Sequence, residues 1–349
     1  MKKGARYNLW LLLIGWTALF LLPSPVKAEQ KGSRDTERPI LLYYVFIQGP
    51  GSPQEESIQV DLTRRRIGAW LYYTTSPRWQ PNGSYVIAWY DDLGAQVSRY
   101  SFRNHRFGNL QSPSKVFGIR GKRYNLDIGV GIWPTNAWSY DGKWVLGESG
   151  RGLERVYLPT GRRRVIVSYK WLGQGDLRYI YGLDWSADGK WIAYSLSGHD
   201  PAHRGPYDPE SPYFNDPGTH YNLWLVRVNG SDRHYLGHGS RPRFSPDGRW
   251  LVCVDRFNKR FGVGIRLYDL KARPVTSRWL IRDALAACFV PHQDNVLVVL
   301  ANGNLVISNL HGRILSRLMT FQQIKKHIFT DSERMFYPIG TIERVDVDW

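Results

Sequence analysis

Histidines and carboxylates gather in one long polar stretch, residues 197–222. The stretch reads SGHDPAHRGPYDPESPYFNDPGTHYN, and its histidines and carboxylates are His199, Asp200, His203, Asp208, Glu210, Asp216 and His220. Imidazole and carboxylate groups are ligands for Zn²⁺, Mn²⁺ or Ca²⁺. Their spacing matches no specific metal motif, so we predict no cofactor and keep a divalent metal only as an alternative.

The same stretch also carries aromatic side chains among its prolines. A long polar loop with aromatics suits recognition of a sugar or a peptide, because such loops are often functional in compact domains. The structural alternative is a proline-stiffened lid whose aromatics pack on neighbouring elements. A second long connection, 112–138, should lie on the same side of the molecule as residues 197–222. The binding residues that we predict from these two segments are His199, Asp200, His203, Tyr207, Tyr213, His220, Arg123 and Tyr124.

A repeated unit must position these loops. The decamer WSADGKWIAY, 185–194, combines an aromatic anchor, a tight turn ending in Asp-Gly, and a strand. It recurs as WQPNGSYVIAW from Trp79, WSYDGKWVLG from Trp138 and FSPDGRWLVCV from Phe244, with weaker copies from Phe289 and Phe329. The anchors are 59, 47, 59, 45 and 40 residues apart. Self-similarity at a period of about 40 to 50 residues indicates a propeller or a solenoid.

Each hairpin is followed by a second pair of strand signals. The clearest is NLWLVRVNGSDRHYLG, 222–237, in which an Asn-Gly turn separates two alternating strands. Each repeat therefore predicts four antiparallel strands, a to d, which is the composition of a propeller blade. No ten-residue stretch shows helical periodicity with caps, so we predict an all-β chain.

These motifs resemble a known repeat. The sequences FSPDGRW, WSADGKW, WSYDGKW and LWLVRVNGSDRHYL are similar to the WD-like repeats of TolB-type β-propellers. The resemblance covers about residues 38–349 and implies a β-propeller that binds a partner without catalysis. It transfers no catalytic residue, because no ligand set matches position by position.

The number of blades follows from the anchors and the length. Six anchors give six repeats, while the N-terminal stretches ILLYYVFI and SIQVDLTRRRIGAWLYY look like further b, c and d strands. We expect six or seven four-stranded blades, with a slight preference for seven, closed by strands from both termini because an open ring exposes sheet edges.

The first 28 residues have the pattern of a secretory signal peptide. Basic residues precede an apolar run from about Leu9 to Leu22, and Val26 and Ala28 offer small residues for cleavage. We expect cleavage near Ala28, a short linker over 29–37 and a propeller over 38–349. An uncleaved membrane anchor is the alternative, although the run is short for a bilayer span.

The chain is strongly basic. Its net charge of +17 becomes +13 after cleavage, because the segment contains four basic and no acidic residues. Turns between strands a and b and between c and d share one face of a propeller. We predict that this face is basic, through Arg64, Arg65, Arg66, Arg162, Arg163 and Arg164. Such a face is either ordinary solvated surface or a docking surface for an anionic polymer or membrane.

Three classes of function compete. The first, which we favour, is an exported binding or scaffold module for a protein or polymer. We expect it to be monomeric or part of a hetero-complex, and we expect no nucleic acid as its partner. The alternative is a carbohydrate-active enzyme resembling a polysaccharide lyase, with a metal in 197–222. A serine peptidase is excluded, since the sequence has no Gly-x-Ser-x-Gly motif.

Cys253 and Cys288 allow one disulfide at most, and we expect free buried thiols.

Overall fold

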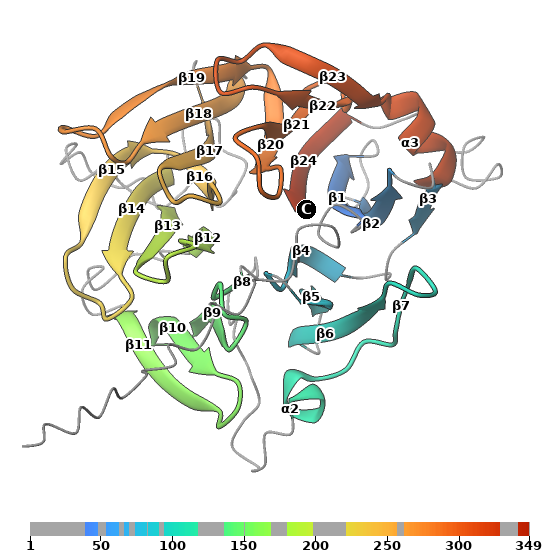
Figure 1. Ribbon diagram of the computed structural model, residues 1–349. Helices are drawn as coiled ribbons and strands as arrows, with labels where there is room; N and C mark the ends of the chain where they lie inside the picture. The colour runs from blue at the N-terminus through green and yellow to red at the C-terminus, as the bar shows by residue number, and fades with distance from the viewer. Residues whose placement is uncertain are drawn as a thin grey trace, which may run out of the picture.

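A ring of antiparallel sheets surrounds a central axis in the computed structural model (Figure 1). The structure describes residues 39–47, 54–62, 66–69, 74–81, 83–90, 94–117, 136–149, 151–168, 180–197, 221–256, 262–328 and 341–348. Within these residues the strands form six four-stranded sheets. The predicted all-β propeller is confirmed, and we number its sheets as blades 1 to 6.

Blades 1 to 3 come from the two ends and the first half of the chain. From the axis outwards, blade 1 consists of β24 (Thr341–Asp348), β1 (Ile40–Ile47), β2 (Gln54–Asp61) and β3 (Arg66–Ala69). Blade 2 consists of β4 (Thr74–Trp79), β5 (Tyr85–Tyr90), β6 (Gly94–Ser101) and β7 (Arg106–Phe107). Blade 3 consists of β8 (Asn136–Trp138), β9 (Trp144–Ser149), β10 (Gly152–Tyr157) and β11 (Arg162–Ser168).

Blades 4 to 6 follow the same pattern. Blade 4 consists of β12 (Ile180–Trp185), β13 (Trp191–Ser197), β14 (Tyr221–Arg227) and β15 (His234–His238). Blade 5 consists of β16 (Ser240–Phe244), β17 (Trp250–Arg256), β18 (Val263–Asp269) and β19 (Thr276–Arg282). Blade 6 consists of β20 (Ala284–Phe289), β21 (Val296–Leu300), β22 (Leu305–Ser308) and β23 (Ile314–Met319).

The innermost strands close the ring. Each contacts the next in the order β24, β4, β8, β12, β16, β20 and back to β24. The two ends of the chain meet in blade 1, where Leu41 of β1 pairs with Asp348 of β24. The preference for seven blades is therefore not borne out by the described sheets. The N-terminal strands β1, β2 and β3 and the C-terminal strand β24 form one sheet, which matches the alternative of six blades closed by strands from both termini.

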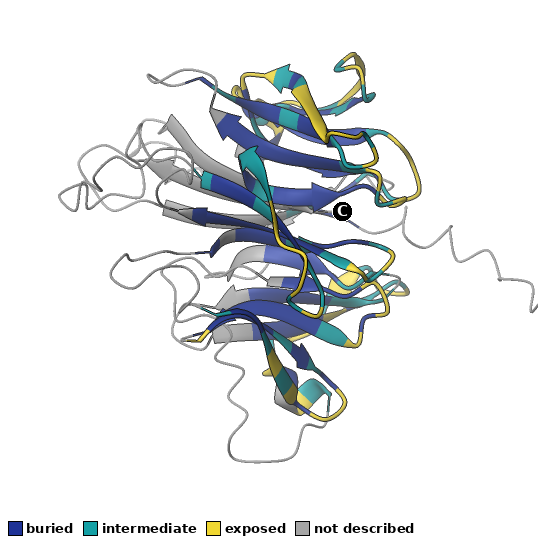
Figure 2. Ribbon diagram, turned by 90° about the vertical axis from the view of Figure 1, so that its left-hand side faces the viewer, coloured by how far each residue is buried: buried dark blue, intermediate teal, exposed yellow. Residues whose placement is uncertain are grey.

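Apolar side chains fill the spaces between blades. Between blades 3 and 4, for example, Leu146 and Leu153 pack in one cluster with Leu183 and Ile192, and all four are fully buried. Among the described residues, the exposed ones lie mainly in the turns on one face of the disc, at the right in Figure 2. The blades thus form a rigid frame whose turns are presented to solvent.

Within the described residues, two short helices depart from the all-β prediction. α2 (Pro113–Val116) follows blade 2, and α3 (Phe321–Ile328) contacts the outer strand β3 of blade 1. Ile324 of α3 is completely buried in the adjoining core cluster. A helix of eight residues is too short to show a clear periodic pattern in the sequence, so tertiary packing decides its conformation.

The a–b turns of blades 3, 4 and 5 share one hydrogen-bonded structure. In blade 4 the Ser186 hydroxyl donates to Asp188 Oδ1 at 2.6 Å and accepts from the Trp191 amide at 2.9 Å. The serine, aspartate and tryptophan of the turns in blades 3 and 5 make the same bonds. The repeated letters Ser-x-Asp-Gly-Lys/Arg-Trp therefore encode a turn whose polar groups are satisfied locally.

Replacing the turn glycines tests this assignment. The predicted positive φ of Gly189 and Gly248 is confirmed, at 70° and 69°. A Cβ at either position would meet nothing within 4 Å. Valine at either site should therefore cost only backbone strain, about 1 kcal/mol or more of unfolding free energy. Urea denaturation measures it, and variants as stable as the parent would contradict the turn assignment.

The remaining sequence predictions concern cysteines and the N-terminus. Cys253 and Cys288 are both buried and form no disulfide, as expected. The predicted signal peptide, 1–28, and linker, 29–37, lie outside the described residues. Among the residues that are described, no helix has the length and hydrophobicity needed to cross a membrane.

Candidate binding site at the channel mouth

The aromatic anchors of the repeats hold neighbouring blades together. Trp79, Trp138, Trp185, Phe244 and Phe289 each end an innermost strand and are buried. The Trp138 indole N–H donates to the carbonyl of Arg78 in blade 2, and that of Trp79 donates to the carbonyl of Pro39, both at 3.2 Å. The anchors therefore fix the positions of the residues beside them.

The residue before each anchor lines the channel. Successive side chains of a strand point to opposite faces of the sheet, so the residue before a buried anchor points away from the core that buries the anchor. These predecessors are Arg78, Ala137, Asp184, Arg243 and Cys288, and all five line one cavity. In β24 the equivalent register position belongs to Asp348, opposite Leu41. From blade 1 to blade 6, the residues at this position are Asp, Arg, Ala, Asp, Arg and Cys. The order of an acidic, a basic and a small residue therefore occurs twice around the ring.

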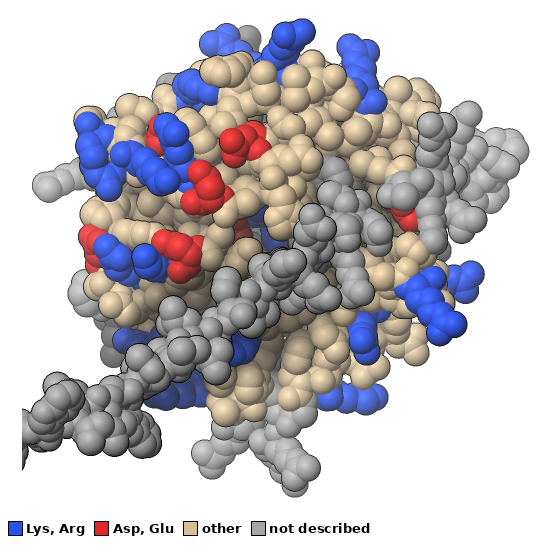
Figure 3. Space-filling view, viewed as in Figure 1, with Lys and Arg blue, Asp and Glu red and all other residues tan. Residues whose placement is uncertain are grey.

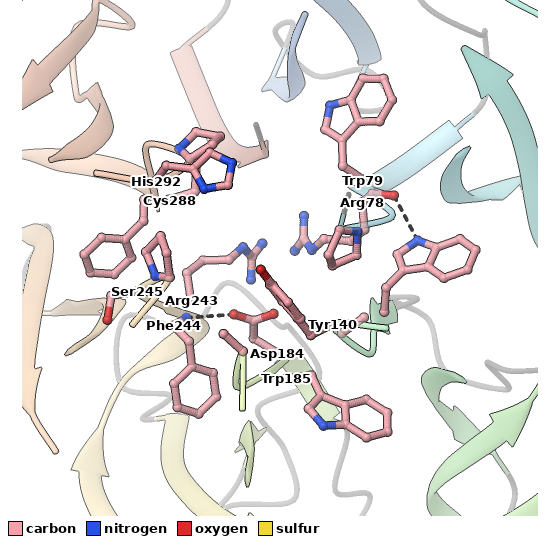
Figure 4. A pocket seen from close by; sticks show the side chains of 17 residues that line it. Arg78, Trp79, Tyr140, Asp184, Trp185, Arg243, Phe244, Ser245, Cys288 and His292 are labelled. Carbon is pink, nitrogen blue, oxygen red and sulfur yellow. Dashed lines mark hydrogen bonds between the residues drawn. The ribbon is translucent and has the colours of Figure 1, made fainter. Parts of the chain in front are cut away.

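The cavity opens on the face that carries the a–b turns. Its volume is about 190 Å³ (Figure 4). The anchors and their predecessors form its wall, and its rim comes from the a–b turns: Pro81, Tyr140, Ala187, Pro246, Pro291 and His292. The site is therefore assembled from five blades at equivalent positions of the repeat.

Two arginines dominate the chemistry of the cavity. Arg78 and Arg243 are only 5% and 4% exposed. They stand on β4 and β16, three places apart in the ring of six innermost strands and thus on opposite sides of the axis. Nη1 of Arg78 donates to the carbonyl of Pro77 at 2.9 Å, and Nη1 of Arg243 to that of Pro242 at 2.7 Å. Figure 4 shows the two guanidinium groups directed toward one another.

One carboxylate and one phenol complete the polar lining near the arginines. Asp184 Oδ2 of blade 4 accepts a hydrogen bond of 2.7 Å from the backbone N–H of Phe244 in blade 5, which fixes the carboxylate and links the two blades. Tyr140 is 46% exposed at the rim, and its hydroxyl points toward the central space in Figure 4. The arrangement can bind a charged group at the axis and place an aromatic ring beside whatever enters.

Arg78 and Arg243 were not among the residues predicted to bind. The signal was present, since both belong to the same short pattern of proline, arginine and aromatic anchor, Pro77-Arg78-Trp79 and Pro242-Arg243-Phe244. Comparison of the position before every anchor would have found them. The predicted cleft lay at the other mouth of the channel, formed by long insertions.

The residues predicted for that cleft lie outside the described part of the chain. They are His199, Asp200, His203, Tyr207, Tyr213, His220, Arg123 and Tyr124. Their role in binding therefore stays a prediction. Within the described residues, no group of three or more His, Cys, Asp or Glu side chains could hold a metal ion.

The predicted basic face is only partly described. Arg162 and Arg164 are exposed at the c–d turn of blade 3, whereas the Arg163 guanidinium lies 3.9 Å from the buried carboxylate of Glu154. Arg64 and Arg65 lie outside the described residues, as does the side chain of Arg66. Figure 3 shows Lys and Arg side chains around much of this face with several acidic groups among them. Arg249 and Asp269, for example, form an ion pair of 2.9 Å.

Comparisons with known proteins report similarity of fold. No protein-family model and no curated protein matches the chain. A structure assigned as TolB from Agrobacterium tumefaciens is 14% identical, with a TM-score of 0.47 over 81% of this chain and 88% of that one. The Cps50 (Swd1) β-propeller domain of Myceliophteria thermophila is 14% identical, with a TM-score of 0.38 over 70% and 86%. The calcium-binding protein regucalcin from Agrobacterium tumefaciens is 13% identical, with a TM-score of 0.44 over 70% and 73%.

The fold defines the class of the protein. A closed ring of four-stranded antiparallel sheets, each built from the same hairpin repeat, is a β-propeller. Because propellers serve many unrelated functions, the function has to be argued from the cavity at the axis.

Proposed function

We propose that this protein is an exported, non-catalytic β-propeller that binds a protein partner at the channel mouth. The observation that carries the proposal is the placement of two buried arginines on opposite blades of one solvent-accessible cavity. Buried charges contribute little to stability on balance, so their retention at a cavity favours a role in recognition. Export rests on the N-terminal segment 1–28, and mature protein should begin at or near Glu29.

The shape of the site favours an end or a side chain of a polypeptide as the group that enters. A hollow of about 190 Å³ on the axis is lined by described residues of blades 2 to 6. A membrane surface is too flat to enter it, and the interior of a polysaccharide needs a groove that is open at both ends. Guanidinium groups keep their protons at all physiological pH values, so they suit binding better than proton transfer.

Photo-crosslinking in the producing cells can test this function. A photoreactive amino acid at Tyr140 should give an adduct with one protein, whereas the same residue at Leu315 should not. Leu315 is 51% exposed on β23, the outer strand of blade 6, far from the axis in Figure 1. The adduct is identified by mass spectrometry, and the partner is then purified for titration.

Titration of the purified partner gives the quantitative result. Tyr140→Ala should weaken binding at least about tenfold, because exposed aromatics at the centre of an interface contribute most of its affinity. Leu315→Ala should leave the affinity unchanged. Equal adducts from both positions, or equal affinities of the two alanine variants, would contradict the proposed function.

A further inference from the structure

Three arginine side chains share one face of blade 3 near its c–d turn. They are Arg155 on β10 and Arg162 and Arg164 on β11. Arg155 lies directly opposite Arg164 in the sheet, so both side chains point to the same face. Arg162 is two residues from Arg164 and shares that face. On β9 this face carries Trp144, which packs against the core between blades 3 and 4, so the three arginines are turned toward blade 4.

The c–d turn of blade 4 lies against this part of β11 (Figure 1). Nη2 of Arg164 donates to the backbone carbonyl of Asn229 in that turn at 3.4 Å. The turn approaches so closely that a Cβ on Gly230 would lie 2.7 Å from the carbonyl oxygen of Ile166. This contact holds Arg164 at the seam between the two blades, with the exposed Arg162 on the same strand.

The stacked arginines of blades 4 and 5 have acidic partners. In blades 3, 4 and 5 the first residue of strand b is a tryptophan with an arginine guanidinium over its ring. The pairs are Arg155–Trp144 at 4.5 Å, Arg227–Trp191 at 4.4 Å and Arg249–Trp250 at 4.5 Å. Asp232 forms an ion pair with Arg227 at 3.1 Å, and Asp269 forms one with Arg249 at 2.9 Å.

Blade 3 lacks such a partner. Among the described residues, no carboxylate forms an ion pair with Arg155, Arg162 or Arg164. Glu154 is next to Arg155 in the sequence, but adjacent side chains of a strand point to opposite faces. Its carboxylate pairs instead with Arg151 at 2.5 Å. The three arginines therefore form a cluster of like charge.

Arg155 shows the electrostatic cost of this cluster. It is half-buried, and its enclosed Nε has no hydrogen-bond partner in the described part of the chain. Burial, together with the charges of Arg164 and Arg162, lowers the pKa of its guanidinium. Arginine nevertheless keeps its proton at physiological pH, so the repulsion persists until an anion offsets it.

A phosphoryl group matches the cluster in charge and in geometry. A phosphomonoester is close to a dianion above pH 7, since its second pKa is about 6, and it presents three acceptor oxygens. Guanidinium forks bind such oxygens in pairs, which makes arginine well suited to phosphate recognition. Three positive charges without a paired carboxylate favour a dianion over a monoanion such as a carboxylate or a phosphodiester.

We propose that Arg155, Arg162 and Arg164 form a binding site for the dianionic phosphate of a phosphomonoester at the seam between blades 3 and 4. Trp144 supports the site, because its ring contacts both Arg155 and Tyr157. None of these residues lines the cavity at the axis, so the site does not depend on the proposed function. The phosphate belongs to a soluble compound or to a lipid headgroup, which present the same group.

Methyl phosphate is the simplest probe. Calorimetric titration of the full mature chain above pH 7, at constant ionic strength against chloride, should show one saturable site. Arg162→Gln and Arg164→Gln should each weaken binding at least about tenfold, because each removes a hydrogen bond between charged groups. Both side chains are exposed, so these variants should keep the fold, as their thermal unfolding can verify.

Arg249→Gln is the matched control. It removes an exposed arginine that is also stacked on the first tryptophan of strand b but is neutralised by Asp269. The affinity for methyl phosphate should therefore be unchanged. The proposal is overturned if methyl phosphate shows no saturable binding, or if Arg249→Gln weakens binding as much as Arg162→Gln.

Dimethyl phosphate tests the choice of a dianion. This diester has the same phosphoryl centre but one negative charge, and it should bind at least about tenfold more weakly than methyl phosphate. Equal affinities of the two compounds would contradict a site for a phosphomonoester dianion.

Vesicles identify the source of the phosphate. Phosphatidylcholine vesicles with about one-fifth phosphatidic acid present a phosphomonoester on a membrane. Flotation of the parent and of Arg249→Gln with these vesicles, but not of Arg162→Gln, assigns a lipid headgroup. Binding of methyl phosphate without flotation assigns a soluble phosphate compound, and failure of both probes to bind overturns the site.

Discussion

Glu148→Gln should stabilise the protein at alkaline pH and leave its stability almost unchanged at pH 5. Glu148 lies on β9 with only 3% of its surface exposed. Burial raises the pKa of its carboxyl group from 4.5 to about 8, although a backbone hydrogen bond with Ile180 opposes the shift. The folded protein therefore holds a proton at this site that the unfolded chain releases above pH 4.5.

The sign of the pH dependence follows from this difference in proton binding. Because the folded state binds more protons, the Glu148 contribution to unfolding free energy decreases as pH rises from 4.5 to 8 and is constant above that. The full decrease is at most about 5 kcal/mol, from 1.36 kcal/mol for each pKa unit. Glutamine is neutral throughout and removes this decrease. Urea denaturation at pH 5 and pH 9 measures the difference between parent and variant.

Glu154→Gln is the matched control in the same blade. Glu154 is 1% exposed on β10, and its carboxylate forms an ion pair of 2.5 Å with Arg151. The Arg151 side chain is 63% exposed, but Glu154 is buried and loses a hydrogen bond between charged groups, so this variant should be less stable than the parent at pH 9. If Glu148→Gln also loses stability at pH 9, Glu148 is ionised and engaged in the folded state, and the prediction is wrong.

Trp138→Ala should destabilise the fold by about 3–5 kcal/mol, the usual cost of truncating a buried aromatic side chain. Trp138 is 4% exposed and packs with Ile87, Val145 and Val156 in the core between blades 2 and 3. Its indole N–H also bonds the carbonyl of Arg78 across the blade boundary. The substitution therefore removes packing and a polar link at the same interface, as denaturant unfolding can measure.

Two further variants separate the contributions. Trp138→Phe keeps a ring but loses the indole N–H, and should cost about 1 kcal/mol beyond any change in packing. Tyr140→Ala, two residues further and exposed, should change stability by less than about 0.5 kcal/mol. If Trp138→Ala is as mild as Tyr140→Ala, the anchors do not hold the blades together.

The repeat made the blades predictable from the sequence. The Ser-x-Asp-Gly turn, the aromatic anchor and the following strand are local features, and each copy forms the same hydrogen bonds. Assembly of blade 1 was less predictable, because Ile40 and Asp348 belong to distant parts of the chain. The weak copy from Phe329 illustrates this, because residues 329–340 lie outside the described part and the innermost strand of blade 1, β24, begins at Thr341.

The candidate site was harder to predict than the fold. The histidines of 197–222 attract attention because they are adjacent in sequence, whereas Arg78 and Arg243 are separated by more than half of the propeller. Only the ring geometry brings the two arginines face to face. Strand alternation explains why they line the channel, but the opposition of blades 2 and 5 depends on the number of blades.

The meeting of the two chain ends in blade 1 also has a consequence for biosynthesis. The innermost strand of that blade, β24, is the last strand of the described chain to leave the ribosome, while its partner β1 is the first. Blades 2 to 6 can form as each hairpin emerges, but the inner edge of β1 stays open until β24 has been synthesised. Closure is then a slow, non-local step. Until it occurs, the exposed edge is where a nascent chain would pair with a neighbouring one, so timely synthesis of the last eight residues of the ring protects it from aggregation.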